Sequence, residues 1–129
     1  MAISLTKLSP MWEVFDLPAL MAFCEYVLGF ERISYAEDWW CMLQHGSITI
    51  MLNTAYEKDQ RPDVPDAARV RGHADAELYF DTPDPRAVYD QLCEKGWPAS
   101  EPKVTHYGFL EVTTQDPDGF VLHFLCPAK

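Results

Sequence analysis

Hydrophobic and polar positions in this chain follow the same order twice. The first copy is the segment Val14–Phe30, and the second is Tyr79–Trp97, about 65 residues later. Each copy has an aromatic residue and Asp near its start, Pro two residues after that Asp, and Gly followed by an aromatic residue at its end. The repeat predicts two structurally similar halves.

Both copies carry the signals of a helix start and stop. Asp16 in the first copy and Thr82 in the second are able to accept hydrogen bonds from the free N–H groups at a helix start. Pro18 and Pro83 then fall in the first turn, where proline is tolerated. Apolar side chains recur at helical spacing at Leu20, Phe23, Val27 and Leu28, and at Val88, Leu92 and Cys93. We therefore expect one helix in each copy, followed by a glycine that ends it.

Strand patterns lie on both sides of these helices. Before the helices we expect strands at Ser9–Phe15 and Asp75–Phe80. After them we expect three strands in each half: Glu31–Glu37, Trp39–His45 and Ile48–Asn53, then Ala99–Thr105, Phe109–Gln115 and Phe120–Leu125. His45-Gly46 and the run Asp116–Gly119 are turn signals between the last two strands of each half. Each half is thus predicted to be β-α-β-β-β.

This order of elements predicts an α+β fold, in one domain that spans residues 1–129. The first βαβββ module covers residues 7–54 and the second covers residues 73–127. Residues 55–72 between them are polar and interrupted by Pro62 and Pro65, so we interpret them as a linker or flap.

Composition narrows the class of partner. Twenty acidic residues against ten Lys and Arg give a formal net charge of −10, which argues against binding to nucleic acid or to anionic membranes. There is no apolar run long enough to span a bilayer, and the N-terminus does not resemble a secretory signal, so we expect a cytoplasmic protein. The four cysteines form no CxxC pair, and we expect them to be buried, reduced thiols.

The chain resembles the vicinal oxygen chelate superfamily, which includes glyoxalase I, extradiol dioxygenases, fosfomycin resistance enzymes and bleomycin resistance proteins. The resemblance rests on FDLPALMAFCEYVLGFE, then ELYFDTPDPRAVYDQLCEKG, Tyr107-Gly108, Glu111 and DPDGFVLHF, in that order. It spans nearly the whole chain. It implies that the paired modules form a curved mixed sheet around a cup, and that the protein is a homodimer.

Metal-using members of the superfamily place one ligand on the first strand and one on the last strand of each module. The matching positions here are Ser9, Met51, Asp75 and His123. Serine and methionine are poor ligands for the divalent metals in question, and Glu77, on the same strand face, is a substitute for Asp75. Two protein ligands are fewer than the three of a usual catalytic site, so we expect no functional metal and no other cofactor.

The face toward the implied cup then mixes apolar, aromatic and acidic side chains. We take the candidate ligand-binding residues to be Met11, Glu13, Trp40, Met51, Asp75, Glu77, Tyr107 and His123. Which of Trp39 and Trp40 faces inward stays open. His123 is either a ligand contact or a core histidine bonded to Asp75 or Glu77, and Glu111 is either an interstrand partner or a ligand contact.

These residues favour a metal-free protein that binds a small molecule, similar to bleomycin resistance proteins, with a preference for a cationic or aromatic ligand. The alternative is an enzyme of the same superfamily, a glyoxalase-like lyase or a dioxygenase with a displaced set of metal ligands. A third interpretation is a scaffold with a collapsed cup. There is no GxSxG elbow and no glycine-rich phosphate loop.

Overall fold

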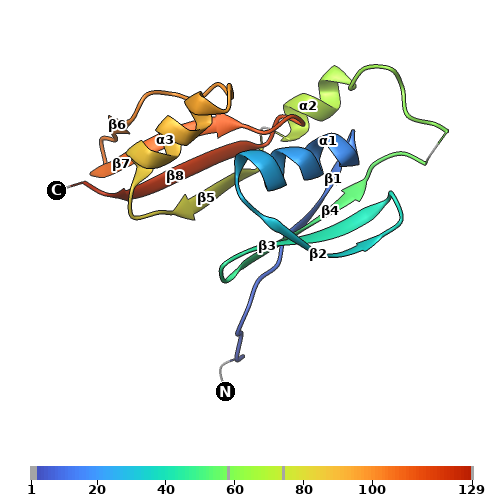
Figure 1. Cartoon of the computed structure of the whole chain (residues 1–129), viewed down its shortest axis with the longest axis horizontal. Helices are drawn as coiled ribbons and strands as arrows, with labels where there is room; N and C mark the ends of the chain where they lie inside the picture. The colour runs from blue at the N-terminus through green and yellow to red at the C-terminus, as the bar shows by residue number, and fades with distance from the viewer. Residues whose placement is uncertain (1–2, 58, 74, 129) are drawn as a thin grey trace. The chain divides into compact units, whose positions relative to one another are not determined.

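Figure 1 shows the chain as a computed structural model, which describes residues 3–57, 59–73 and 75–128. The chain divides into two compact units, Met1–Arg61 and Pro62–Lys129. Each unit contains one βαβββ module with its own four-stranded mixed sheet, so the predicted α+β fold class is confirmed. The division falls within the segment predicted as a linker.

Unit 1 holds the first sheet, sheet A. Its elements are β1 (Met11–Val14), α1 (Leu17–Ala22), η1 (Phe23–Val27), β2 (Glu31–Ala36), β3 (Trp40–His45) and β4 (Ile48–Thr54). The strand order is β1-β4-β3-β2, with β1 parallel to β4 and the other pairs antiparallel. Asp16 caps α1 as predicted, because its carboxylate accepts the backbone N–H of Ala19 at 3.1 Å. The end of this helix is a π-turn, with Leu28 N donating to Phe23 O at 3.3 Å.

Unit 2 holds the second sheet, sheet B. Its elements are α2 (Ala67–His73), β5 (Glu77–Asp81), α3 (Pro85–Glu94), β6 (Lys103–Val104), β7 (Phe109–Gln115) and β8 (Val121–Pro127). The strand order is β5-β8-β7-β6, again with one parallel pair, β5 and β8. Helix α3 packs on β7 and β8, where Leu92, Val112 and Leu122 are buried.

The predicted start of the second helix is wrong. Asp84, not Thr82, is the N-cap of α3, since its carboxylate accepts the N–H of Ala87 at 3.2 Å. Pro85 is the proline of the first turn, and Pro83 precedes the helix. The carboxylate of Asp84 is better placed to accept this bond than the hydroxyl of Thr82. The Thr82 hydroxyl instead accepts the backbone N–H of Asp84 at 3.4 Å.

Helix α2 lies inside the segment interpreted as a linker, where no helix was predicted. Its first turn begins at Asp66, whose side chain accepts the N–H of Ala68 at 2.9 Å. Its far end contacts the turn between β7 and β8: His73 stacks on Phe120 at 4.1 Å between ring centroids, and its Nδ1 lies 2.8 Å from a carboxylate oxygen of Asp118. These contacts join residues far apart in the sequence, so local propensity alone gives no sign of them.

Three predicted strands are shorter than expected, and the first of them, predicted at Ser9–Phe15, is reduced to Met11–Val14. Asp75 lies in a turn after α2, its N–H donating to Gly72 O at 3.2 Å, and β5 begins only at Glu77. The strand predicted at Ala99–Thr105 is reduced to Lys103–Val104, because Pro98 and Pro102 carry no N–H for the ladder.

The prediction of buried thiols holds for half of the cysteines. Cys24 and Cys41 are buried, Cys126 is half-buried, and Cys93 is exposed on the outer side of α3. All four are free thiols.

Candidate functional site

The open face of sheet A carries four of the predicted ligand-binding residues. Met11 lies opposite Met51 in the parallel pair, and Glu13 lies opposite Asn53. Asn53 in turn lies opposite Trp40 on β3. Because directly opposed residues share a face, Met11, Glu13, Trp40 and Met51 project to the same side of the sheet. The other side is the buried one, with Val14, Cys41, Leu43 and Leu52 fully covered.

The same register places Trp40, and not Trp39, on the open face of sheet A. Trp40 is the first residue of β3 and shares the face of Glu13, whereas Trp39 lies in the turn before the strand and is 50% exposed.

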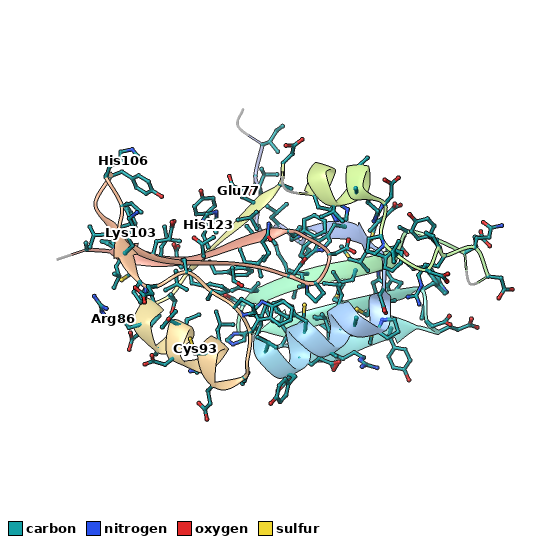
Figure 2. All side chains as sticks on the ribbon, turned by 90° about the horizontal axis from the view of Figure 1, so that it is seen from above. Glu77, Arg86, Cys93, Lys103, His106 and His123 are labelled. Carbon is teal, nitrogen blue, oxygen red and sulfur yellow. The ribbon has the colours of Figure 1, made fainter. Side chains whose placement is uncertain are left out.

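The open face of sheet B is the more polar of the two. Glu77 and Tyr79 on β5, Glu111 and Thr113 on β7, and His123 on β8 all project to it. Figure 2 shows Glu77 and His123 on the side of sheet B away from α3, the helix that carries Arg86 and Cys93. We call these five residues the His123 cluster.

His123 is the centre of this cluster. Its Nε2 lies 2.8 Å from the carboxylate of Glu77, and its Nδ1 lies 3.3 Å from the carboxylate of Glu111 and 3.2 Å from the hydroxyl of Thr113. The imidazole is nearly covered, whereas the Glu77 side chain is 47% exposed. His123 is thus hydrogen-bonded to Glu77, which is the bond that the sequence analysis gave for a core histidine.

Two tyrosines complete the surface around this histidine. The ring of Tyr79 stacks on His123 with 4.1 Å between centroids and 9° between planes, and it remains 55% exposed. The hydroxyl of Tyr107 donates to Glu111 at 3.3 Å. Partial desolvation and the nearby carboxylate charges raise the pKa of both phenols above the ordinary value, so both stay neutral O–H donors.

The positions matched to metal ligands are a poor fit to a divalent ion. The Ser9 hydroxyl is bonded to that of Thr49 at 2.6 Å, Met51 offers a thioether, and Asp75 lies outside the strand. Glu77 takes the place of Asp75, but the second carboxylate of the cluster, Glu111, approaches the opposite nitrogen of the His123 ring. One ion at Nε2 would therefore have two protein ligands, not three. Within the residues that the structure describes, no three or more His, Cys, Asp or Glu side chains converge on a metal position.

A groove of about 630 Å³ adjoins the cluster. Tyr107, Glu111 and Thr113 form one wall of it, and Lys103 and His106 lie on the strand and turn beyond (Figure 2). A volume of this size admits a small molecule. The groove joins aromatic, acidic and hydroxyl groups along one surface of unit 2.

The sequence identified part of this arrangement. Glu77, Tyr107 and His123 lie together as candidates from the same unit, and Asp75 does not join them. Tyr79 was not chosen as a site residue, although its alternation with Glu77 along the strand was the available signal. The cup shared by both modules stays a prediction.

The sequence matches the family model of the glyoxalase/bleomycin resistance protein/dioxygenase superfamily over residues 12–124. The chain therefore belongs to this superfamily, which confirms the resemblance. No curated protein sequence matches it.

Solved structures share the fold at low sequence identity. A bleomycin resistance determinant encoded on the transposon Tn5 has a TM-score of 0.74 at 19% identity, covering 95% of this chain and 98% of its own. The bleomycin-binding protein of Streptomyces verticillus, complexed with copper(II)-bleomycin, has 0.70 at 16%, covering 99% of both chains. A lactoylglutathione lyase from Agrobacterium tumefaciens has 0.71 at 17%, covering 93% of this chain and 92% of its own. Both binding proteins and an enzyme thus share this architecture.

Among the described residues, no helix combines the length and apolar character needed to cross a bilayer.

Proposed function

We propose that this protein binds, without converting it, a small molecule that has a flat aromatic part and a positive charge. The observation that carries the proposal is the half-exposed ring of Tyr79, stacked on His123 beside the half-exposed carboxylate of Glu77. An aromatic face next to a carboxylate attracts an organic cation more strongly than either group alone. No metal takes part in the proposed binding.

Two further features support this chemistry. The formal net charge of −10 attracts cationic compounds to the protein. Glu111 and Thr113 contact Nδ1 of His123, so the imidazole ring on which Tyr79 stacks is held in place. The fold is shared with bleomycin-binding proteins whose structures were solved in complex with bleomycin. The superfamily resemblance adds homodimerisation to the proposal.

The proposal is tested by titrating the protein with proflavine, a cationic planar dye, and with acridine, its neutral parent near neutral pH. Proflavine at about a hundredfold excess over its Kd adds roughly 2.7 kcal/mol of stability, which raises the Tm by about 10 °C. We expect Glu77→Gln to weaken proflavine binding about tenfold and acridine binding hardly at all, because one charge–charge interaction is lost. Tyr79→Ala is expected to weaken both.

Glu94→Gln on α3 is the matched control, since it removes the same charge from an exposed position on another element. Equal affinities for the two dyes, or equal effects of E77Q and E94Q, would contradict the proposal. Native mass spectrometry and elemental analysis of the purified protein report subunit number and metal together. Stoichiometric Zn, Mn, Fe or Ni would instead favour the alternative, a metal-dependent lyase or dioxygenase.

A further inference from the structure

A second cavity lies in unit 1, away from the His123 cluster in the sequence and built by other elements. It has a volume of about 610 Å³ and is formed where β1 and β4 end, beside the turn between β2 and β3. Three aromatic side chains line it: Phe15, Trp39 and Tyr56. Its size suits a small organic molecule.

The aromatic wall is held in place by the sheet. Phe15 and Tyr56 meet edge to face, with 5.9 Å between centroids and 81° between planes. The backbone beside them is fixed by two hydrogen bonds, from Thr54 N to Trp39 O and from Ala55 N to Val14 O, both 2.9 Å long. The wall is therefore preformed rather than assembled by a ligand.

Three carboxylates also line this cavity. Glu37 and Asp38 come from the turn between β2 and β3, and Glu57 comes from the segment after β4; all three are exposed. Exposed carboxylates next to aromatic rings form a surface that favours a cation over an anion or a neutral molecule.

The cavity already holds one cation of the protein itself. The guanidinium carbon of Arg61 lies 5.1 Å from the centre of the Phe15 ring, and its Nη1 lies 3.3 Å from the carboxylate of Asp16. The Arg61 side chain is 44% exposed and comes from the end of unit 1, so it has room to leave this position. Phe15 and Asp16 thus form a position that accepts a planar guanidinium.

We propose that this cavity binds a small flat organic cation of the amidine or guanidine type, and that Arg61 competes with the ligand for the face of Phe15. The ligand's charged end takes the place of the guanidinium between Phe15 and Asp16, and its apolar body lies along Trp39 and Tyr56. The inference does not depend on the proposed function, which concerns other residues in unit 2.

The test uses benzamidine as the probe and benzamide, its neutral isostere, as the comparison, with affinities measured by calorimetry. Arg61→Gln is expected to tighten benzamidine binding about fivefold and to leave benzamide unchanged, because an internal competitor of the same charge is removed. Arg86→Gln, on α3 of unit 2 (Figure 2), is the matched control: it changes the net charge equally and is expected to have no effect. A gain in affinity on losing an arginine of the site is a result that general destabilisation does not produce.

Two further variants test the carboxylates that line the cavity. Asp38→Asn and Glu37→Gly are each expected to weaken benzamidine about threefold without weakening benzamide. Glycine is suited to position 37, where the backbone has a φ of +48°, so this variant keeps the turn. The indole N–H of Trp39 is expected to shift in the NMR spectrum on addition of benzamidine.

The inference is overturned if R61Q leaves benzamidine affinity unchanged or weakens it, or if benzamide binds as tightly as benzamidine. It is also overturned if E77Q, but none of the unit 1 variants, changes benzamidine affinity. That last result would place the probe at the His123 cluster and leave the proposed function standing. Conversely, a response to R61Q with none to E77Q supports the cavity of unit 1 independently.

Discussion

Asp116, in the turn between β7 and β8, provides the sharpest test of the electrostatics. Its side chain is buried, and one carboxylate oxygen accepts the backbone N–H groups of Asp118 at 2.9 Å and Phe120 at 3.0 Å. Burial raises the pKa of Asp116 from 3.8 to about 7, an effect that the backbone donors oppose and the charge of Asp118 enhances. His73 of α2 contacts Asp118 in the same turn.

The sign of the effect follows from proton linkage. A carboxyl that binds its proton more tightly in the folded state contributes stability that is fully present below the unfolded pKa of 3.8 and is lost as the pH rises through about 7. The rise of the Asp116 pKa from 3.8 to about 7 corresponds to a total loss of about 4 kcal/mol in the free energy of unfolding as the pH rises. About 3 kcal/mol of this loss falls between roughly pH 5 and pH 8.

Asp116→Asn removes this ionisation while its amide oxygen still accepts the two N–H groups. We therefore expect the free energy of unfolding of wild type to fall, relative to that of D116N, by about 3 kcal/mol between roughly pH 5 and pH 8. Urea unfolding followed by circular dichroism at several pH values measures the difference. Wild type and D116N share every other titratable group, so the difference between their profiles isolates Asp116. Parallel pH profiles, or a wild type that gains on D116N with rising pH, would show that the turn holds a charged carboxylate instead.

Two further predictions concern Gly119, which lies beside the unpredicted helix α2, and Asp84, the N-cap of α3. Gly119→Ala is expected to cost about 1–2 kcal/mol in urea unfolding, because the backbone there has a φ of +94° and a Cβ would lie 3.0 Å from Cγ1 of Val70 in α2; an unchanged midpoint would mean that α2 yields freely. Asp84→Ala is expected to cost about 1 kcal/mol by loss of the α3 cap, and Thr82→Ala much less; equal costs would contradict the cap assignment.

Hydrophobic periodicity was sufficient to predict most of the sheets. The alternation of apolar and polar residues predicted β3, β4 and β7 to within a residue or two, because one face of each strand is buried and the other is not. Helix α2 could not be predicted in the same way. It is short and polar, and it is held by contacts of Val70 and His73 with a turn about 45 residues away, which no local pattern encodes.

The error at Asp75 has a specific cause. The two copies of the repeat were aligned on Asp16 and Asp81, whereas the cap of α3 is Asp84, three residues further along the chain. With Asp84 as the cap, the residue that corresponds to Ser9 is Glu77, each lying seven residues before its helix cap. Several possible cap residues in one short loop therefore led to a candidate site residue, Asp75, that lies outside β5. The predicted fold did not depend on this choice.

Once aligned by their caps, the two modules show where the chemistry of this chain is concentrated. Met11 opposite Met51 in sheet A corresponds to Tyr79 opposite His123 in sheet B. The first module thus has two thioether side chains at these positions, of which Met11 is 54% exposed, whereas the second has an aromatic ring and an imidazole.

The residues seven positions before each helix cap, Ser9 and Glu77, also differ in how exposed their hydrogen bonds leave them. In the first module the Ser9 hydroxyl is bonded to Thr49, which satisfies both groups within the sheet. In the second, Glu77 is bonded to His123 and still exposes nearly half of its side chain. A hydroxyl pair that is satisfied internally offers little free energy to a ligand, whereas an exposed carboxylate fixed on a stacked imidazole keeps its charge available. For the site proposed at the His123 cluster, selectivity for a charged ligand therefore rests on the exposed carboxylate of Glu77.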